Sequence, residues 1–125
     1  MTELPKFLLD SNICIYWLGG VQSVLERVMA RADEIAVSSI SYGEVAMGLI
    51  PGSAQWEAGQ RFFRLVPVLP FDRAAADSYA RLPFRRARFD RLIAAHALAL
   101  GARLVTNDRR GFADVPGLDV EEWRP

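Results

Sequence analysis

Apolar and polar residues alternate along the chain in a way that predicts strands and helices in turn. Short apolar runs predict buried strands at residues 7–9, 35–37, 66–69, 103–105 and 118–120. Apolar residues recur at helical spacing over residues 12–18, 21–31, 42–49, 53–65, 72–82 and 89–100. This order predicts one α/β domain over residues 1–125, with a mainly parallel central sheet of four to five strands flanked by helices.

Acidic residues stand where such a sheet would place a ligand. Asp10 follows the first predicted strand and Asp108 follows the fourth, and parallel sheets bind ligands beyond the carboxyl ends of their strands. Glu44 lies early in the helix after the second strand, which Ser38 and its neighbours can cap. Asp90 begins the helix of residues 89–100, where the helix dipole favours an anion. These four acids can therefore converge on one edge of the sheet.

A cluster of carboxylates indicates metal chemistry. Carboxylates that lie close together repel one another, and without a counter-ion some of them must take up a proton. A divalent cation resolves this conflict, and ligands that are all oxygen favour Mg²⁺ or Mn²⁺ over zinc. Such an ion could polarise a phosphoryl oxygen and lower the pKa of an attacking water.

Three of the acids also have a purely structural interpretation, which the sequence leaves open. Asp10 could cap the helix that starts near Asn12, and Asp90 could cap its own helix. Asp108 could begin a turn with Asn107. Glu44 is less easily explained in this way.

The charge of the chain is balanced, but its basic residues are unevenly distributed. Fifteen basic and fifteen acidic residues give a net charge of zero, which argues against a strongly basic, non-specific nucleic-acid binder. Lys6 is the only lysine, so fourteen of the fifteen basic residues are arginine. Three of them, Arg85, Arg86 and Arg88, are candidates for binding phosphate groups, and the alternative is a helix face that is simply solvated.

The residue inventory excludes several other kinds of site. His96 and Cys14 are the only histidine and cysteine, which rules out a two-histidine ribonuclease and a histidine–cysteine zinc site. We expect both to be structural, His96 in the middle of a helix and Cys14 as a small core residue. A response-regulator-like phosphoacceptor needs a lysine after a late strand, and Lys6 precedes the first strand. No apolar run is long enough to span a membrane, and neither a signal peptide nor a disulfide is expected, which predicts a cytoplasmic protein.

Four segments in order resemble the motifs of PIN domains. LLDSNICIYWL (residues 8–18) has the acid after the first strand, and SSISYGEVAMGL (38–49) has the glutamate on a helix. RFDRLIAAHALALG (88–101) has the aspartate that opens a helix, and LVTNDRRGFADVPGLDVEEW (104–123) has the threonine and the last acid. Together they cover nearly the whole chain, and its size and ending most resemble the VapC-type toxins of bacterial toxin–antitoxin pairs.

The resemblance implies a function and a set of site residues. It implies an Mg²⁺- or Mn²⁺-dependent endoribonuclease that forms a homodimer and is inhibited by a cognate antitoxin that also binds DNA. Asp10, Glu44, Asp90 and Asp108 would be the catalytic acids and metal ligands, with Ser38 near them. Asn12 and Thr106 would support the ligands by hydrogen bonds. The alternative is a PIN fold without catalytic activity that dimerises or binds a partner.

Some large apolar residues bear on dimerisation. A set of large apolar residues could pack in the core, which the sequence favours, or contact a partner. The set is Trp17, Leu18, Val21, Trp56, Phe62 and Phe63.

Overall fold

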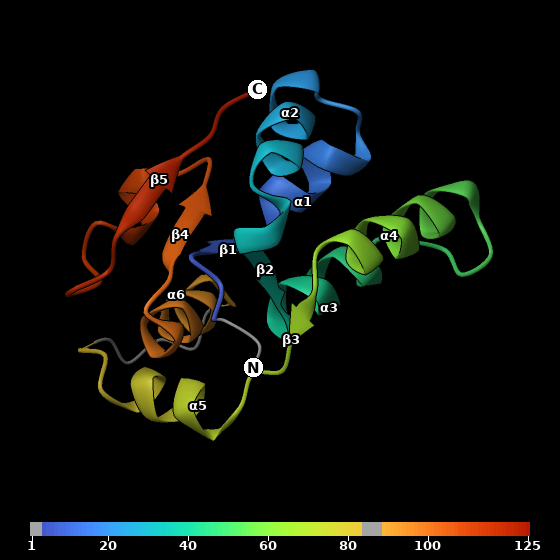
Figure 1. The fold of residues 1–125 in the computed structure, drawn as a ribbon. Coiled ribbons are helices and arrows are strands. Elements are labelled where there is room, and N and C mark those ends of the chain that lie inside the picture. Colours follow the sequence, from blue (N-terminus) through green and yellow to red (C-terminus); the bar gives the residue numbers. More distant parts are fainter. Residues whose placement is uncertain (1–3, 84–88) are drawn as a thin grey trace.

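The fold is taken from a computed structural model that describes residues 4–83 and 89–125. Arg85, Arg86 and Arg88 lie outside the described residues. Within them, five parallel strands form one sheet in the order β3-β2-β1-β4-β5 (Figure 1). The strands are β1 (Phe7–Leu9), β2 (Ile35–Ser38), β3 (Val68–Leu69), β4 (Arg103–Thr106) and β5 (Val120–Glu122). The predicted single α/β domain with a parallel sheet is confirmed.

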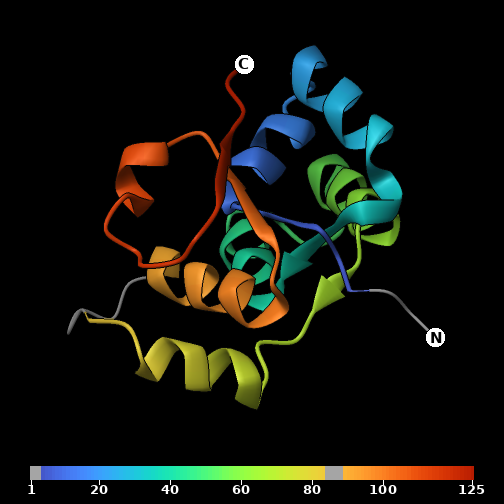
Figure 2. The same cartoon turned by 60° about the vertical axis from the view of Figure 1, so that its left-hand side comes forward.

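Helices cover both faces of the sheet, as Figures 1 and 2 show. They are α1 (Ser11–Leu18), α2 (Gln22–Ala30), α3 (Ser39–Met47), α4 (Ala54–Leu65), α5 (Arg73–Ala80) and α6 (Phe89–Leu100). Short 3₁₀ turns precede β2 and follow β4: η1 (Ala32–Glu34) and η2 (Arg109–Phe112). In the described residues, no helix combines the length and the apolar character that crossing a membrane would require.

The strands divide their side chains between two apolar cores because successive residues of a strand point to opposite faces. Leu9 of β1 belongs to the core that α1, α2 and α4 cover. Its neighbour Leu8 belongs to the core under α6, and α5 packs on the outside of that helix. With both faces covered, every residue of β2 is buried, as expected of an internal parallel strand.

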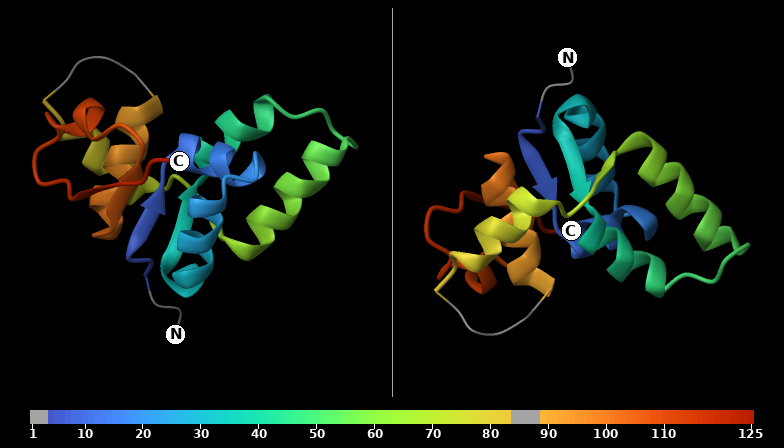
Figure 3. Two further views of the ribbon diagram at one scale, coloured as in Figure 1. Left: turned by 90° about the horizontal axis from the view of Figure 1, so that it is seen from above. Right: turned by 90° about the horizontal axis from the view of Figure 1, so that it is seen from below.

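The connections between strands change side next to β1. The chain passes from β1 to β2 through α1 and α2, on one face, and from β3 to β4 through α5 and α6, on the other (Figure 3). β1 pairs with both β2 and β4. Helices that leave neighbouring strands in opposite directions open a crevice at the carboxyl ends of the strands, and Asp10 directly follows β1 there.

Two strands begin later than predicted. The third was predicted at residues 66–69, but β3 spans only Val68–Leu69, after Pro67, and lies at an edge of the sheet. The last strand was wrongly predicted at Leu118 to Val120, because it begins two residues later and runs from Val120 to Glu122. Gly117, at φ +76°, makes a turn, and the Leu118 N–H bonds back to Val115 O instead of joining the sheet.

Three aromatic residues of α1 and α4 pack on each other and on the core. The rings of Trp17 and Phe62 lie 5.1 Å apart, and those of Phe62 and Phe63 lie 5.0 Å apart. Phe62 is fully buried, and Trp17 and Phe63 are partly buried against the same core. This favours the core-packing interpretation of these residues.

A charged cluster holds the last strand against the sheet. The Glu121 carboxylate accepts hydrogen bonds from Trp123 Nε1 and from Arg31, and Arg103 lies 3.6 Å from it. The Arg31 guanidinium also stacks 4.6 Å from the centre of the Phe7 ring. Burial alone would raise the pKa of Glu121, but the bonds from Trp123 and Arg31 and the nearby positive charges outweigh it and lower this pKa.

We therefore predict that Glu121 stabilises the fold only while it is ionised. A carboxyl group whose pKa is lower in the folded state adds stability above its unfolded pKa and loses it as the pH falls through its folded pKa. In urea titrations, Glu121→Gln should cost stability at about pH 7 and much less at about pH 3. The exposed Glu57→Gln is the control, and a cost for Glu121→Gln that did not change with pH would contradict the prediction.

Candidate active site

Four acids reach the carboxyl edge of the sheet from four different segments. Asp10 follows β1, Asp108 follows β4, Glu44 lies on α3 and Asp90 lies in the first turn of α6. All four line one pocket of about 190 Å³, together with Ser11, Asn12 and Phe112. The structure thus brings together the four acids that the sequence selected.

Asp10 lines this pocket and is held on both carboxylate oxygens. Its Oδ1 accepts a hydrogen bond of 2.8 Å from the Ser11 N–H, and its Oδ2 accepts one of 2.8 Å from the Thr106 hydroxyl. Thr106 is fully buried, while 9% of the Asp10 surface is exposed. Asp10 caps α1, as the structural interpretation expected, and it still lines the pocket.

Ser11 links two of the acids and was missed by the sequence analysis as a site residue. Its N–H donates to Asp10, and its hydroxyl donates to Glu44 Oε1 over 2.7 Å. α1 is thereby bonded to α3 across the pocket. The available signal was the serine that follows the acid in the first of the four motifs.

Asp108 is partly a capping residue. Its Oδ1 accepts from the Gly111 N–H at 3.1 Å and so caps η2, and its own N–H donates to the Thr106 hydroxyl at 3.1 Å. A Cβ at Gly111 would lie 2.6 Å from Asp108 Oδ2, so a larger residue at this position would disturb the contact by which Asp108 caps η2. The Thr106 hydroxyl is therefore hydrogen-bonded both to the side chain of Asp10 and to the backbone of Asp108.

Asp90 is not the N-cap of its helix, since α6 begins at Phe89. The next residue, Arg91, is buried and forms an ion pair with Asp114, with 2.9 Å between Nη1 and Oδ1. This pair ties the start of α6 to the segment that follows η2. It thereby fixes the first turn, which carries Asp90.

Asn12 supports the pocket less directly than Thr106. Its side-chain amide donates to Asn107 Oδ1 at 3.2 Å, and Asn107 in turn donates to the Tyr16 hydroxyl at 2.8 Å. Asn12 thus orients the residue next to Asp108 and, in the described part of the chain, has no hydrogen bond to one of the acids. Ser38 does not line the pocket.

The electrostatics of the pocket disfavour charge on Asp10. Burial raises its pKa, the hydrogen bonds from Thr106 and Ser11 partly offset this, and the charges of Glu44 and Asp90 raise it further. A cation in the pocket would remove the repulsion, and the ligands available to it are carboxylate oxygens, which suit Mg²⁺ or Mn²⁺. In residues 4–83 and 89–125, however, no three acidic, histidine or cysteine side chains are arranged closely enough to form a ready-made metal site.

The single histidine and the single cysteine are buried away from this pocket. His96 Nδ1 lies 2.9 Å from Ser38 Oγ, and burial lowers the pKa of His96. Cys14 is fully buried among apolar residues of the core, and burial raises the pKa of its thiol. Both residues have the structural surroundings that the sequence predicted.

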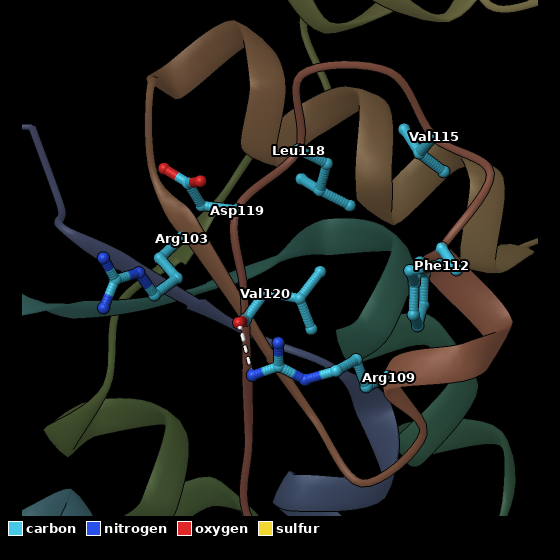
Figure 4. Close-up of a pocket in the computed structure, with 8 residues that line it drawn as sticks. Arg103, Arg109, Phe112, Val115, Leu118, Asp119 and Val120 are labelled. Carbon is cyan, nitrogen blue, oxygen red and sulfur yellow. Dashed lines mark hydrogen bonds between the residues drawn. The ribbon is translucent and has the colours of Figure 1, made fainter.

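A larger pocket of about 380 Å³ lies on the other side of Phe112, between the segment after η2 and strand β5. Figure 4 shows the Arg109 guanidinium bonded to Val120 O, over 3.1 Å, and the Arg103 guanidinium turned away from Phe112 and Val115. None of the four acids lines this pocket. The chemistry of the candidate site therefore belongs to the smaller, acidic pocket.

Comparison with known protein families agrees with this geometry. Residues 7–118 match the model of the PIN domain, which is most of the chain. The chain belongs to the PIN-domain family. The four acids of the pocket all lie within the matched range.

The similarity of this PIN domain to individual proteins extends over nearly its full length. It is 34% identical to the tRNA(fMet)-specific endonuclease VapC of Shigella flexneri, over 94% of this chain and 98% of that protein. The solved structure of DNA-bound VapBC from Salmonella typhimurium contains a chain with 28% identity and a TM-score of 0.84, covering 96% of this chain and 99% of that one. VapBC-5 of Mycobacterium tuberculosis, a member of the VapBC family of toxin–antitoxin systems, matches at 27% identity and a TM-score of 0.65, covering 97% and 100%.

We predict that Asp10→Asn stabilises the metal-free PIN domain at neutral pH. A raised pKa means that folding disfavours the ionised carboxyl group, so the wild type loses stability as the pH rises through this pKa. Asparagine removes the charge and keeps one oxygen that can accept a hydrogen bond.

Scanning calorimetry in the presence of EDTA measures this effect. The midpoint of unfolding should be higher for Asp10→Asn than for the wild type, and the difference should shrink at acid pH, where Asp10 is protonated. Asp77→Asn, at an exposed position of α5, is the control. A variant less stable than the wild type at neutral pH would show that the charge of Asp10 is not the dominant cost.

Proposed function

We propose that this PIN domain is a metal-dependent endoribonuclease that cleaves RNA phosphodiester bonds, and that it is the toxin of a toxin–antitoxin pair. The observation that carries the proposal is the pocket at the carboxyl edge of the sheet, where acids from four separate segments meet. A fold that only had to be stable would gain nothing from placing Asp10 in a buried position beside Glu44 and Asp90. Repulsion that folding does not need is typical of a functional site.

The four acids are the proposed metal ligands. Asp10, Glu44, Asp90 and Asp108 would hold Mg²⁺ or Mn²⁺, whose carboxylate preference fits this set. When bound, the ion supplies a Lewis acid for the phosphate and lowers the pKa of a water that attacks it. Among the described residues, no other side chain lining the pocket offers a general base of comparable strength, because the remaining ones are Ser11, Asn12 and Phe112.

The remaining residues of the site act by holding these carboxylates. Thr106 and the Ser11 N–H fix the orientation of the Asp10 carboxylate, and the Ser11 hydroxyl fixes one oxygen of Glu44. Hydrogen bonds of this kind orient ligands before a metal arrives. Arg85, Arg86 and Arg88, which lie outside the described residues, are proposed to contact the flanking phosphates.

The substrate and partners follow from the names of the relatives. A relative at 34% identity is a tRNA(fMet)-specific endonuclease, which makes initiator tRNA the first substrate to try. Similar chains occur in VapBC toxin–antitoxin structures, one of them DNA-bound. We therefore propose a cognate antitoxin as inhibitor, contact with DNA through that antitoxin, a homodimer of this chain, and action in the cytoplasm.

A PIN fold that only dimerises or binds a partner is the alternative. Such a module would have no use for the acidic pocket, and nothing in the described residues favours it.

The first test is RNA cleavage by the purified chain. With Mg²⁺ or Mn²⁺ it should cut initiator tRNA or an RNA in a mixed cellular pool, and EDTA should stop the reaction. Asp90→Asn should lower the rate by about 100-fold or more, because it removes the charge of a metal ligand and little volume. Asp77→Asn, on α5, should cleave like the wild type.

Two outcomes of this test would count against the proposal. Cleavage that survives EDTA and Asp90→Asn would exclude this pocket as the catalytic site. An absence of cleavage in every RNA pool, together with an absence of divalent metal binding, would favour the non-catalytic module.

A further inference from the structure

A second pocket, almost entirely apolar, adjoins the acidic one. It measures about 240 Å³, and Glu44 lines both pockets. Its other walls are Ser39, Ile40, Gly43, Met47 and Phe89. Phe89 immediately precedes Asp90, so α3 and the first turn of α6 contribute residues to both pockets.

Large apolar side chains at this pocket face solvent. Phe89 is 56% exposed and Met47 is 80% exposed, although both could have been polar without loss to the core. An exposed aromatic ring beside an acidic pocket has a recognised use in nucleic-acid binding, because every base has a face that can stack on it.

Gly43 is an independent sign that a ligand approaches this pocket. It lies in the middle of α3 with ordinary helical backbone angles, a position where glycine destabilises a helix relative to alanine. A Cβ built there would meet no atom of the described residues within 4 Å. The packing of the described chain therefore does not require glycine, and a bare backbone is what a ligand in close contact needs.

We propose that this apolar pocket binds one unstacked nucleobase of the RNA, next to the phosphate held in the acidic pocket; this rests on the proposed function. The ring of Phe89 stacks on the base, and the backbone at Gly43 also borders the pocket. Glu44 lines both pockets, so they are adjacent, as the base and the phosphate of one nucleotide are.

Besides Glu44, the described residues give this pocket one polar side chain, that of Ser39. The Ser39 hydroxyl accepts a hydrogen bond of 2.9 Å from the Phe71 N–H, which leaves its own hydrogen to donate to a base. A mainly apolar pocket with one hydroxyl donor accepts bases mainly by shape and stacking. The pocket would therefore favour some bases over others and fix the position of the strand, without recognising a strict sequence.

Binding of short RNA without catalysis tests this inference. The probes are a fluorescein-labelled uridine octanucleotide and the same ribose–phosphate octamer without bases, titrated in EDTA and followed by anisotropy. The wild type should bind the uridine octamer about 10-fold more tightly than the abasic one, a difference typical of a stacked base. Because no cleavage is measured, this result is independent of the nuclease test.

Two variants locate the effect. Phe89→Leu removes the aromatic face, and Gly43→Leu adds a side chain that fills part of the pocket. Both should lose most of the preference for the uridine octamer and keep the affinity for the abasic octamer. Gly48→Leu is the matched control, since it adds the same side chain at the end of α3, outside the pocket, and should bind like the wild type.

Thermal unfolding of each variant separates a local effect from a loss of fold. Equal binding of the two octamers by the wild type, or no binding of either, would overturn the inference. The same conclusion would follow if Phe89→Leu and Gly43→Leu weakened both probes equally. Sedimentation that showed a dimer breaking apart in both variants, with the base preference kept, would instead assign the pocket to a second copy of this chain.

Discussion

The burial of one carboxylate, that of Asp10, beside two other acids is the constraint on which this structure depends. Asp10 is placed at the end of the central strand, where it is largely removed from water, and Glu44 and Asp90 raise the pKa of Asp10 further. The fold tolerates this because the Ser11 N–H and the Thr106 hydroxyl each hold one oxygen of Asp10. The same bonds that stabilise the charge also fix the orientation of the carboxylate in the pocket that the other three acids line.

The sheet explains why such distant residues meet. β1 lies between β2 and β4. The helical connections of these strands lie on opposite faces of the sheet, which leaves a crevice at the carboxyl ends of the strands. Asp10 and Asp108 reach this point directly from strand ends, while Glu44 and Asp90 reach it from α3 and α6. The Arg91–Asp114 ion pair and the Ser11–Glu44 hydrogen bond then fix the two helices relative to the strands.

The pattern of apolar residues predicted most of this arrangement because burial on both faces leaves a clear signal. Parallel strands such as β2 read as continuous apolar runs, and the acids that follow strands stand out against them. What the pattern could not predict depends on three-dimensional contacts. The start of β5 depends on the turn at Gly117, and the role of Ser11 depends on its distance from Glu44, thirty-three residues away. The absence of steric need for glycine at position 43 is likewise visible only in space.

Direct titration of the metal-free chain with Mn²⁺, by calorimetry near neutral pH, tests most directly whether the four carboxylates form a metal site. The wild type should bind Mn²⁺ with a defined stoichiometry, and Asp10→Asn should weaken the binding by at least about 10-fold because a charged ligand is lost. Binding that is absent from the wild type, or that is unchanged in Asp10→Asn, would contradict the view that the acidic pocket exists to hold a divalent cation.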